Sequence, residues 1–356
     1  MINLRTAIND LGYGIVGLNL FKELIKITDV CLFPIGHPQI PNNDPTLVDN
    51  INKALGNQEN FDPNSPTLTI WHEFALHERI GKGKNVALPF FELDKFTEKT
   101  KRSIQSQDHI IVPSNWAFDI IRDQVKSFWS EISVIPMGVD TNFFRPMNLF
   151  SDKPYRFLNI GKIEIRKGHD ILCDLFNSAF TEEDDVTLYI SWDNPFMSPA
   201  DKQQWVDMYK NSKLGEKIHF IPRQPSVLGE YWAADCLIQP SRAEAICLPI
   251  LEAMACGKPV ITTNYSGMTA FCDKDNSYLV DIDGLEPARD GAFFHSDSLE
   301  TGGWASFGDK QFTQFVEYMR FCYTNKVSTN KNGLVTADKL NWKNVAKNVL
   351  QVLNNE

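Results

Sequence analysis

Residues 240–259 read PSRAEAICLPILEAMACGKP and decide the fold class. A short apolar run typical of a buried strand comes directly before them. Pro249 suits the first turn of a helix, where a missing N–H costs nothing, and Gly257 with Pro259 suits a helix end. The segment therefore predicts a strand, a loop and then a helix that runs from Pro249 to Cys256.

Short apolar runs alternate with helical patterns along the rest of the chain. The runs in the first half predict strands at Leu4–Ile8, Val30–Phe33, Thr67–Trp71, Asn85–Leu88, His109–Val112 and Ile132–Ile135. Those in the second half predict strands at Arg156–Ile160, Val186–Ile190, Lys217–Ile221, Cys236–Gln239, Pro259–Thr263 and Ser277–Val280. Helical patterns between them include Leu18–Ile27, Trp116–Val125, His169–Ser178 and Val227–Ala234. This alternation is typical of an α/β protein with parallel sheets covered by helices.

The length of 356 residues is enough for two domains. The alternation breaks at Asn142–Pro154, which holds two prolines and no strong period, so we expect a linker there. We place an N-terminal domain at 1–146 and a C-terminal domain at 147–338. Residues 339–356 predict an amphipathic helix, and its periodicity leaves open whether it packs on the second domain or back on the first.

Composition excludes several classes of protein. Apolar residues make up 43% of the chain and charged residues 22%, which is typical of a globular protein. The net charge of −10 argues against nucleic acid as a partner. No apolar stretch approaches the roughly 18 residues of a membrane span, although a peripheral membrane contact stays open. Seven scattered cysteines without a Cys-x-x-Cys motif are typical of reduced thiols, so we expect a cytoplasmic protein.

Two glutamates bracket the start of the predicted helix. Glu244 lies in the loop before it, and Glu252 lies about one turn into it. The N–H groups of Cys247 and Leu248 lie at the helix N-terminus, where anions bind well. This arrangement predicts a diphosphate at the helix start, with carboxylates on either side that accept hydrogen bonds from sugar hydroxyls. The alternative is a solvated loop residue at Glu244 and an ordinary first-turn glutamate at Glu252.

A basic group follows the first strand of the second domain. Lys162 ends this strand, and Arg166 and Lys167 come just before Gly168 and the next helix. Cations at the carboxyl ends of parallel strands point into the crevice where ligands bind. Two of them can clamp a leaving diphosphate and stabilise its growing charge. A solvated basic turn is the alternative.

These motifs together resemble the retaining glycosyltransferases of the GT-B fold, in the large family 4 that includes sucrose synthases and bacterial mannosyltransferases. That family has a Glu-x(7)-Glu motif, which Glu244 and Glu252 match. Val112–Trp116 and Val134–Asp140 look like the closing segments of its first domain, and Asn159–Gly168 looks like the opening of its second. The resemblance implies two Rossmann-like domains that face each other across a cleft.

The resemblance also implies roles for the donor side. Glu244 would hold the transferred sugar and Glu252 the ribose, while Lys162 and either Lys167 or Arg166 would hold the diphosphate. The spacing of this basic group is one residue shorter than the common form. The helix start would supply Ile246, Cys247 and Leu248 to the donor, and the turn at Ile221–Arg223 would line the pocket for the base. The chain departs from the family at Ala245-Ile-Cys247, where Gly-Phe-Gly is usual.

A glycine motif follows the first strand. Gly12-Tyr-Gly14-Ile-Val-Gly17 matches the G-x-G-x-x-G of nicotinamide dehydrogenases. Those enzymes need an acidic residue at the end of the next strand, and Val30–Phe33 has none, so we disfavour that class. A glycine loop also lets the backbone approach a phosphate or sugar, and we assign Gly14 to this contact.

His72 follows another predicted strand and, by the resemblance, touches the donor sugar; a structural histidine is the alternative. His77 is five residues further on, so the pair lacks the i, i+4 spacing of a zinc site. Glu92, at a further strand end, is a candidate for acceptor binding. Asp281-Ile-Asp283 has the spacing of a metal-binding Asp-x-Asp but comes late in the chain. We therefore expect no metal and no cofactor.

The sequence thus predicts a retaining transferase that moves a hexose from a UDP- or GDP-sugar to a glycan or other hydroxyl acceptor, in the synthesis of cell-surface polysaccharide or glycoconjugate. Two alternatives stay open. One is a nucleotide-sugar epimerase or phosphorylase on the same scaffold, and the other is a sugar-nucleotide binding protein without catalysis.

Overall fold

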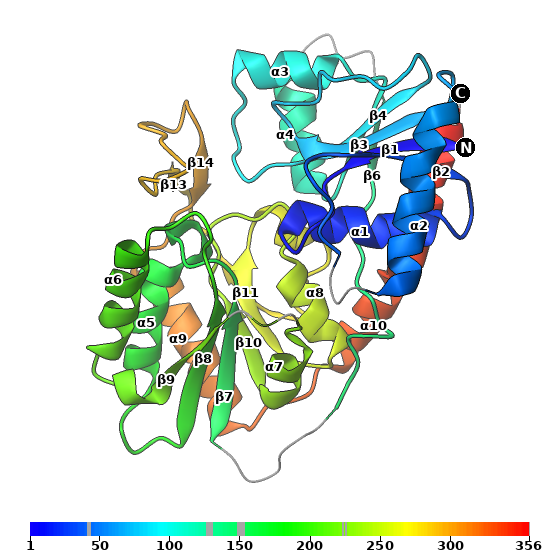
Figure 1. Ribbon diagram of the computed structural model, residues 1–356. Helices are drawn as coiled ribbons and strands as arrows, with labels where there is room; N and C mark the ends of the chain where they lie inside the picture. The colour runs from blue at the N-terminus through cyan, green and yellow to red at the C-terminus, as the bar shows by residue number, and fades with distance from the viewer. Residues whose placement is uncertain (41–43, 126–130, 148–153, 223, 225, 356) are drawn as a thin grey trace. The chain divides into compact units, whose positions relative to one another are not determined.

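The structure is a computed structural model of the chain (Figure 1), and it describes residues 1–356 except 41–43, 126–130, 148–153, 223, 225 and 356. The described residues form two compact units. Unit 1 comprises Met1–Gly138 and Leu340–Glu356, and unit 2 comprises Val139–Lys339. The division therefore falls eight residues before the boundary placed from sequence (146 − 138), and the C-terminal helix belongs to unit 1.

Unit 1 holds a parallel sheet of six strands in the order β2-β1-β3-β4-β5-β6. Its strands are β1 (Ile2–Thr6), β2 (Val30–Pro34), β3 (Thr67–His72), β4 (Asn85–Phe90), β5 (His109–Val112) and β6 (Glu131–Val134). All six predicted strands are present, and the central strands β1, β3, β4 and β5 are largely buried, whereas the edge strand β6 is partly exposed. The strand order reverses direction between β1 and β3. In open parallel sheets, ligands bind at the carboxyl ends of the strands beside such a switch point.

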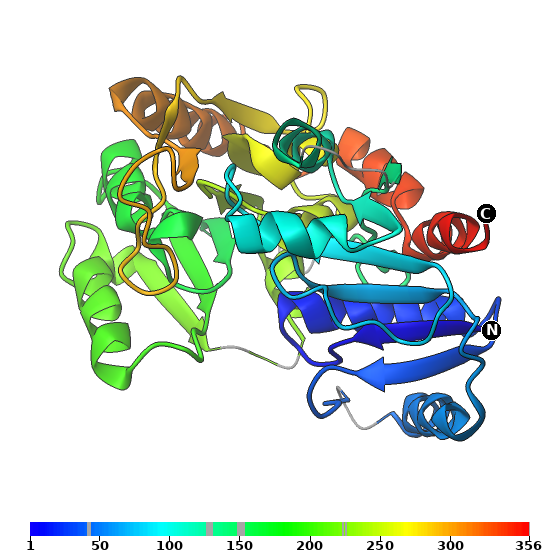
Figure 2. The ribbon, with the colours of Figure 1, turned by 90° about the horizontal axis from the view of Figure 1, so that it is seen from above.

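Helices cover this sheet. They are α1 (Gly12–Leu24), α2 (Pro45–Gly56), α3 (Glu98–Gln105), α4 (Asn115–Gln124) and α11 (Trp342–Asn354), with a 3₁₀ turn η2 (Asn57–Asn60) after α2. Short polar side chains begin several of them: Asp44 accepts from the N–H groups of Thr46 and Leu47, and Ser114 accepts from that of Ala117. Helix α2 lies along the β2 edge of the sheet (Figure 2).

The C-terminal helix α11 packs against α1 of the same unit (Figure 1). Gly138 allows the chain to lie close to the start of α11, since a Cβ there would lie 2.7 Å from the backbone nitrogen of Trp342. At the other end of α11, the Lys84 ammonium donates to the carbonyls of Val352 and Asn355, at 2.9 and 2.6 Å. A cation at a helix C-terminus is favourable because it satisfies carbonyls that lack helical partners.

The predicted start of the first helix and the predicted glycine loop are wrong. Helix α1 begins at Gly12, six residues before the predicted start at Leu18, so the glycines lie inside the helix and not in a loop. A Cβ at Gly14 would overlap Asn9, and a Cβ at Gly17 would overlap Thr6. The motif therefore allows α1 to pack closely on the chain that leaves β1.

Unit 2 holds a second parallel sheet of six strands, in the order β12-β11-β10-β7-β8-β9. Its strands are β7 (Tyr155–Ile160), β8 (Val186–Trp192), β9 (Ile218–Pro222), β10 (Cys236–Gln239), β11 (Val260–Asn264) and β12 (Tyr278–Asp281). The strand order is that of the Rossmann fold, with its switch point between β7 and β10. An antiparallel pair, β13 (Leu285–Pro287) and β14 (Gly303–Ala305), was not predicted.

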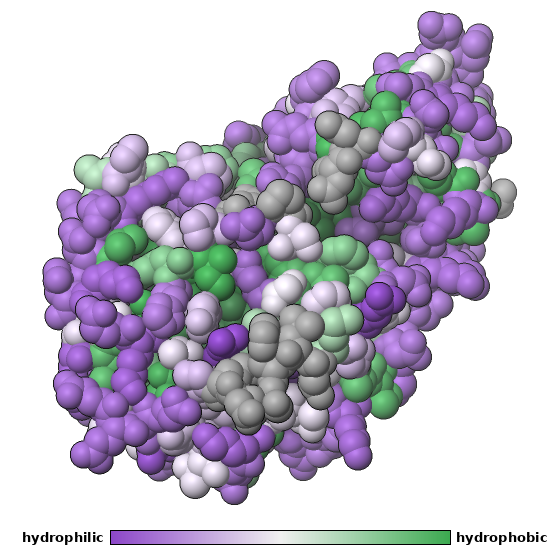
Figure 3. Space-filling model, turned by 60° about the horizontal axis from the view of Figure 1, so that its bottom comes forward, coloured by the Kyte–Doolittle hydropathy of each residue, from purple (hydrophilic) through white to green (hydrophobic). Residues whose placement is uncertain are grey.

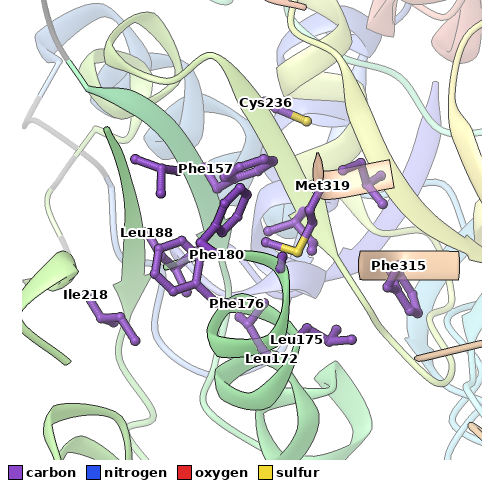
Figure 4. Close-up of a cluster of buried hydrophobic side chains, with 14 of the residues drawn as sticks. Phe157, Leu172, Leu175, Phe176, Phe180, Leu188, Ile218, Cys236, Phe315 and Met319 are labelled. Atoms are coloured by element: carbon purple, nitrogen blue, oxygen red, sulfur yellow. The ribbon is translucent and has the colours of Figure 1, made fainter. Parts of the chain in front are cut away.

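The helices of unit 2 are α5 (His169–Ala179), α6 (Pro199–Lys210), α7 (Leu228–Ala233), α8 (Leu248–Ala255), α9 (Asp309–Thr324) and α10 (Lys331–Lys339), with 3₁₀ turns η3 (Ile165–Lys167), η4 (Gly215–Lys217) and η5 (Ser266–Ala270). Helices α5 and α9 pack on the sheet through a cluster of buried hydrophobic side chains (Figure 4) that includes Phe157, Phe176, Phe180, Phe315 and Met319.

The face of the molecule in Figure 3 is mostly hydrophilic, with small apolar patches among the polar side chains. No helix among the described residues is long and apolar enough to cross a bilayer.

Candidate donor and acceptor sites

The switch point of unit 2 brings the predicted basic and acidic residues together. Arg166 and Lys167 lie in η3, which follows β7, and Glu244 lies in the loop that follows β10. Gly168 ends η3 at φ +78°, in the left-handed region that favours glycine, and a Cβ there would overlap the backbone of Pro240. This close approach brings the basic turn against the loop that carries Glu244.

Glu244 is buried and fully engaged. Its Oε1 lies 2.5 Å from Lys167 Nζ and accepts from Ser241 Oγ at 2.9 Å. Its Oε2 accepts from Arg166 at 3.0 Å, and its backbone N–H donates to Ser266 Oγ at 2.9 Å. Because only 6% of Glu244 is exposed, the alternative of a solvated loop residue is wrong.

The ionisation of this pair follows from its partners. Burial alone would raise the pKa of Glu244, but Lys167 and Arg166 outweigh it and lower that pKa to about 2. Burial alone would lower the pKa of Lys167, and the Glu244 carboxylate outweighs it and raises that pKa. Both groups are therefore charged at neutral pH, in a place from which water is largely excluded.

Hydrogen bonds to several acceptors hold the Arg166 guanidinium in place. Its guanidinium donates to Ala243 O at 2.7 Å and to Glu164 Oε1 at 2.6 Å, in addition to its bond with Glu244. Glu164 is also 3.4 Å from Lys162 Nζ. Burial would raise the pKa of Glu164, but Arg166, Lys167 and Lys162 outweigh it and lower that pKa. Three cations and two carboxylates thus form one network with a net charge of +1 (3 − 2).

Lys162 differs from the other two cations in its exposure. Its side chain is 30% exposed, against 6% for Arg166 and 11% for Lys167. Its Nζ lies 5.4 Å from the ring centres of both Phe196 and Phe293, two exposed aromatic side chains. Arg166 and Lys167 are tied into the protein, so Lys162 is the cation of this network that is most open to a ligand.

Helix α8 begins beside this network. Leu248 is its first residue and Cys247 its N-cap, at φ 66° and ψ 64°. A left-handed conformation costs a residue with a Cβ roughly 1–2 kcal/mol. This strained position is the third of Ala245-Ile-Cys247, where the resembling family usually has Gly. The first turn of α8 still presents backbone N–H groups and the positive end of the helix dipole.

Glu252 has a partner that the sequence did not predict. Its Oε2 accepts a hydrogen bond from the Tyr231 hydroxyl on α7 at 2.7 Å. Burial raises the pKa of Glu252 to about 7, and the Tyr231 bond lowers it only in part. Glu252 therefore titrates near neutrality, whereas Glu244 stays ionised. No sequence signal links these two helices, since the pairing depends on how α7 and α8 pack.

A second group of polar side chains lies at the switch point of unit 1. His72 ends β3, and Tyr13 lies in the first turn of α1, which follows β1. The Tyr13 hydroxyl lies 3.1 Å from His72 Nδ1 and 2.8 Å from Phe90 O. Burial raises the pKa of neighbouring Glu73 to about 7, and the charge of Glu92 adds to this rise. The sequence predicted His72 and Glu92 and missed Tyr13 and Glu73.

The remaining predicted site residues have different outcomes. Gly14 packs against Asn9 inside α1, so the glycine-loop geometry assigned to it is wrong. Arg223 lies outside the described residues. Ile246 is buried in the loop before α8. Asp281 accepts from Asn264, and Asp283 pairs with Lys310 at 2.7 Å. Within the described ranges, no three His, Cys, Asp or Glu side chains gather as a metal site.

Residues 140–283 match the family model of glycosyl transferases group 1. This part of the chain therefore resembles the group 1 glycosyl transferases. Mannosylfructose-phosphate synthase of Agrobacterium fabrum is 25% identical over 196 residues, which cover 50% of this chain and 43% of that protein. D-inositol 3-phosphate glycosyltransferase of Segniliparus rotundus is 29% identical over 166 residues, 42% and 36% of the two chains. The matched part thus spans less than half the length of these curated relatives.

Solved structures resemble this chain along its whole length. Sucrose-phosphate synthase from Thermosynechococcus elongatus superposes with a TM-score of 0.70 at 18% identity, over 99% of this chain and 97% of that one. Anabaena HepE in complex with UDP and glucose gives 0.71 at 15% identity, over 100% and 99%. At these identities the likeness shows the fold, so the predicted GT-B fold with two Rossmann-like domains is confirmed.

Proposed function

We propose that this protein is a retaining glycosyltransferase that moves a hexose from a UDP- or GDP-sugar to a glycan or other hydroxyl acceptor, in the synthesis of cell-surface polysaccharide or glycoconjugate. The network of Lys162, Glu164, Arg166, Lys167 and Glu244 carries this proposal. It combines a net positive charge with the start of α8 at the switch point of the sheet. This combination of cations and N–H groups suits a diphosphate.

The carboxylate of Glu244 supports a role in holding the sugar. A carboxylate offers about four acceptor positions. Among the described residues, Lys167 and Ser241 occupy two on Oε1, and Arg166 occupies one on Oε2. One position on Oε2 is thus left for a donor-sugar hydroxyl. We assign the diphosphate to Lys162 and the α8 amides, while Lys167 and Arg166 hold Glu244 in place and add positive charge.

In the proposed reaction, the bond from the anomeric carbon to the donor phosphate oxygen breaks, and the acceptor oxygen forms a bond on the same face. The acceptor proton passes to the leaving phosphate, so the products are a glycoside and a nucleoside diphosphate. The cations and the α8 dipole stabilise the negative charge that grows on the phosphate. No metal or other cofactor is needed in this scheme, because the protein supplies the positive charge.

Further proposals concern the donor, the location in the cell and the partners of this protein. HepE was solved in complex with UDP and glucose, and we extend a nucleotide-sugar donor to this chain. All seven cysteines are free, buried thiols, which supports a reducing, cytoplasmic location. The acidic chain supports small-molecule and glycan partners over nucleic acid.

The test is a transfer assay with UDP- and GDP-hexoses and a panel of hydroxyl acceptors, with and without a chelator. Release of nucleoside diphosphate that requires an acceptor, and a product whose anomeric configuration by NMR equals that of the donor, would support the proposal. Inverted product, or turnover lost with the chelator, would contradict retention or metal independence. Donor conversion without acceptor would indicate an epimerase, dependence on phosphate a phosphorylase, and binding without turnover a non-catalytic protein.

A further inference from the structure

We propose that Tyr13 is a positioning residue that holds His72 in its Nδ1–H tautomer, so that the bare Nε2 of His72 accepts a hydrogen bond from a substrate hydroxyl. The substrate part of this inference rests on the proposed function. The tautomer part depends only on unit 1.

The tautomer follows from a count of protons. The Tyr13 hydroxyl has one hydrogen and lies 2.8 Å from Phe90 O, a carbonyl that can only accept. That hydrogen therefore points at Phe90. The same hydroxyl lies 3.1 Å from His72 Nδ1, so this contact is a hydrogen bond only if Nδ1 carries the proton. Burial lowers the pKa of His72, so the ring is neutral at pH 7 and Nε2 keeps its lone pair.

The aromatic neighbours fix the plane of this imidazole. Its ring centre is 4.5 Å from that of Tyr13 and 5.1 Å from that of Phe74, which stacks on it at 19°. Trp71 packs edge-on at 5.0 Å. Titratable groups nearby are Glu73 and Glu92, together with Lys99, whose Nζ lies 5.5 Å from the Phe74 ring. With Nδ1 held by Tyr13, Nε2 on the opposite side of the ring has no hydrogen bond to a described residue.

The ligand class follows from the lone pair. Nε2 can accept from a hydroxyl, and it repels a phosphate or carbonyl oxygen, which has no proton to give. The location fits a ligand, because His72 ends β3 and Tyr13 follows β1, the two strands between which the sheet order reverses. Gly14, the residue after Tyr13, packs α1 against Asn9 of the preceding chain, and the Tyr13 ring lies beside His72.

The first experiment is ¹⁵N NMR of the histidine-labelled, full-length protein, with the His72 signals assigned by their loss in His72→Gln. We expect a protonated Nδ1 and a bare Nε2 in the wild type and in Tyr318→Phe, a control far from the ring in sequence. In Tyr13→Phe we expect the proton to redistribute toward Nε2. A wild-type Nε2–H tautomer, or a His72 tautomer unchanged in Tyr13→Phe, would overturn the assignment. This readout needs no substrate, so it stands if the transferase assay fails.

The second experiment measures transfer by the same variants, and it applies once the wild type shows turnover. Tyr13→Phe should lower kcat/KM about 3- to 10-fold, the effect of one neutral hydrogen bond. His72→Gln, whose amide oxygen can accept near the place of Nε2, should retain at least 3-fold more activity than His72→Leu. Equal activity in Gln and Leu variants, or a Tyr13→Phe variant as active as wild type, would overturn the substrate contact and leave the proposed transferase in place.

Discussion

Lys167 Nζ and Glu244 Oε1 lie 2.5 Å apart, and both side chains are nearly excluded from solvent. Removing both charges from water is costly, and breaking such a pair leaves the partner buried without compensation. This pair therefore helps to explain why the loop that carries Glu244 and the turn that carries Lys167, far apart in the sequence, pack together in unit 2. It also gives each residue a structural role beside its proposed role in catalysis.

We expect Lys167→Met to destabilise the protein by about 3–5 kcal/mol, because the Glu244 carboxylate then lacks its nearest cation. Glu244→Gln should have a similar effect. The double variant should be more stable than the sum of the single effects predicts, by at least about 1 kcal/mol. Urea unfolding of the four proteins measures this coupling, and strictly additive effects would show that the two charges do not interact.

We expect Lys162→Ala to lower kcat about 10²- to 10³-fold, the usual effect of removing one group that stabilises charge in the transition state. Its stability should change by less than about 1 kcal/mol, because the side chain is partly exposed. Lys202→Ala is the matched control, since Lys202 pairs with Asp193 at 27% exposure. Equal rates for the two variants would exclude Lys162 from the diphosphate site.

Glu252 should make stability depend on pH near neutrality. Burial raises its folded pKa to about 7, above the ordinary value of 4.5. The folded state therefore binds more protons between these values, so Glu252 opposes folding increasingly as pH rises from about 4.5 through 7. Relative to Glu252→Gln, the wild type should lose up to about 3 kcal/mol between pH 5 and pH 8.

Chemical unfolding of both proteins at the two pH values measures this difference. Tyr231→Phe removes the donor to Glu252 and should move the midpoint to higher pH, because that bond lowers the pKa of the carboxyl. A wild-type profile parallel to that of Glu252→Gln would show that the buried carboxyl does not titrate in this range.

The left-handed backbone at Cys247 predicts an unusual order of stabilities. At an ordinary helix position, Gly is about 1 kcal/mol less stable than Ala. At Cys247, Gly removes the Cβ that conflicts with a φ of 66°, so Cys247→Gly should be at least as stable as Cys247→Ala. Cys322, buried in α9, is the control where Ala should be the more stable. Thermal unfolding of the four variants compares the stability of Gly with that of Ala at each site. An Ala variant more stable than the Gly variant at both sites would contradict the claim that the backbone at Cys247 is strained.

Strands were the part of the fold that the sequence predicted best. Each of the twelve predicted strands is present, because a central parallel strand is a continuous apolar run with clear ends. The start of α1 was misplaced, since glycines usually indicate a loop and here serve close packing against Asn9 and Thr6. The pair β13 and β14 was missed because each strand has three residues and no alternation.

The sequence predicted some residues of the candidate site and missed the partners that they contact. Glu244, Lys162 and Lys167 stand out through their spacing around strand ends. The partners that decide their ionisation, among them Glu164 and Tyr231, are set by packing between elements distant in sequence. The periodicity of the sequence does not indicate such contacts, so neither the low pKa of Glu244 nor the high pKa of Glu252 was predictable.

A crystal structure with a bound UDP- or GDP-sugar tests the central claim most directly. We predict the diphosphate at the first turn of α8, with an oxygen about 2.7–3.2 Å from Lys162 Nζ and a sugar hydroxyl at the same range from Glu244 Oε2. A diphosphate bound away from α8, or a donor sugar that does not contact Glu244, would contradict the account.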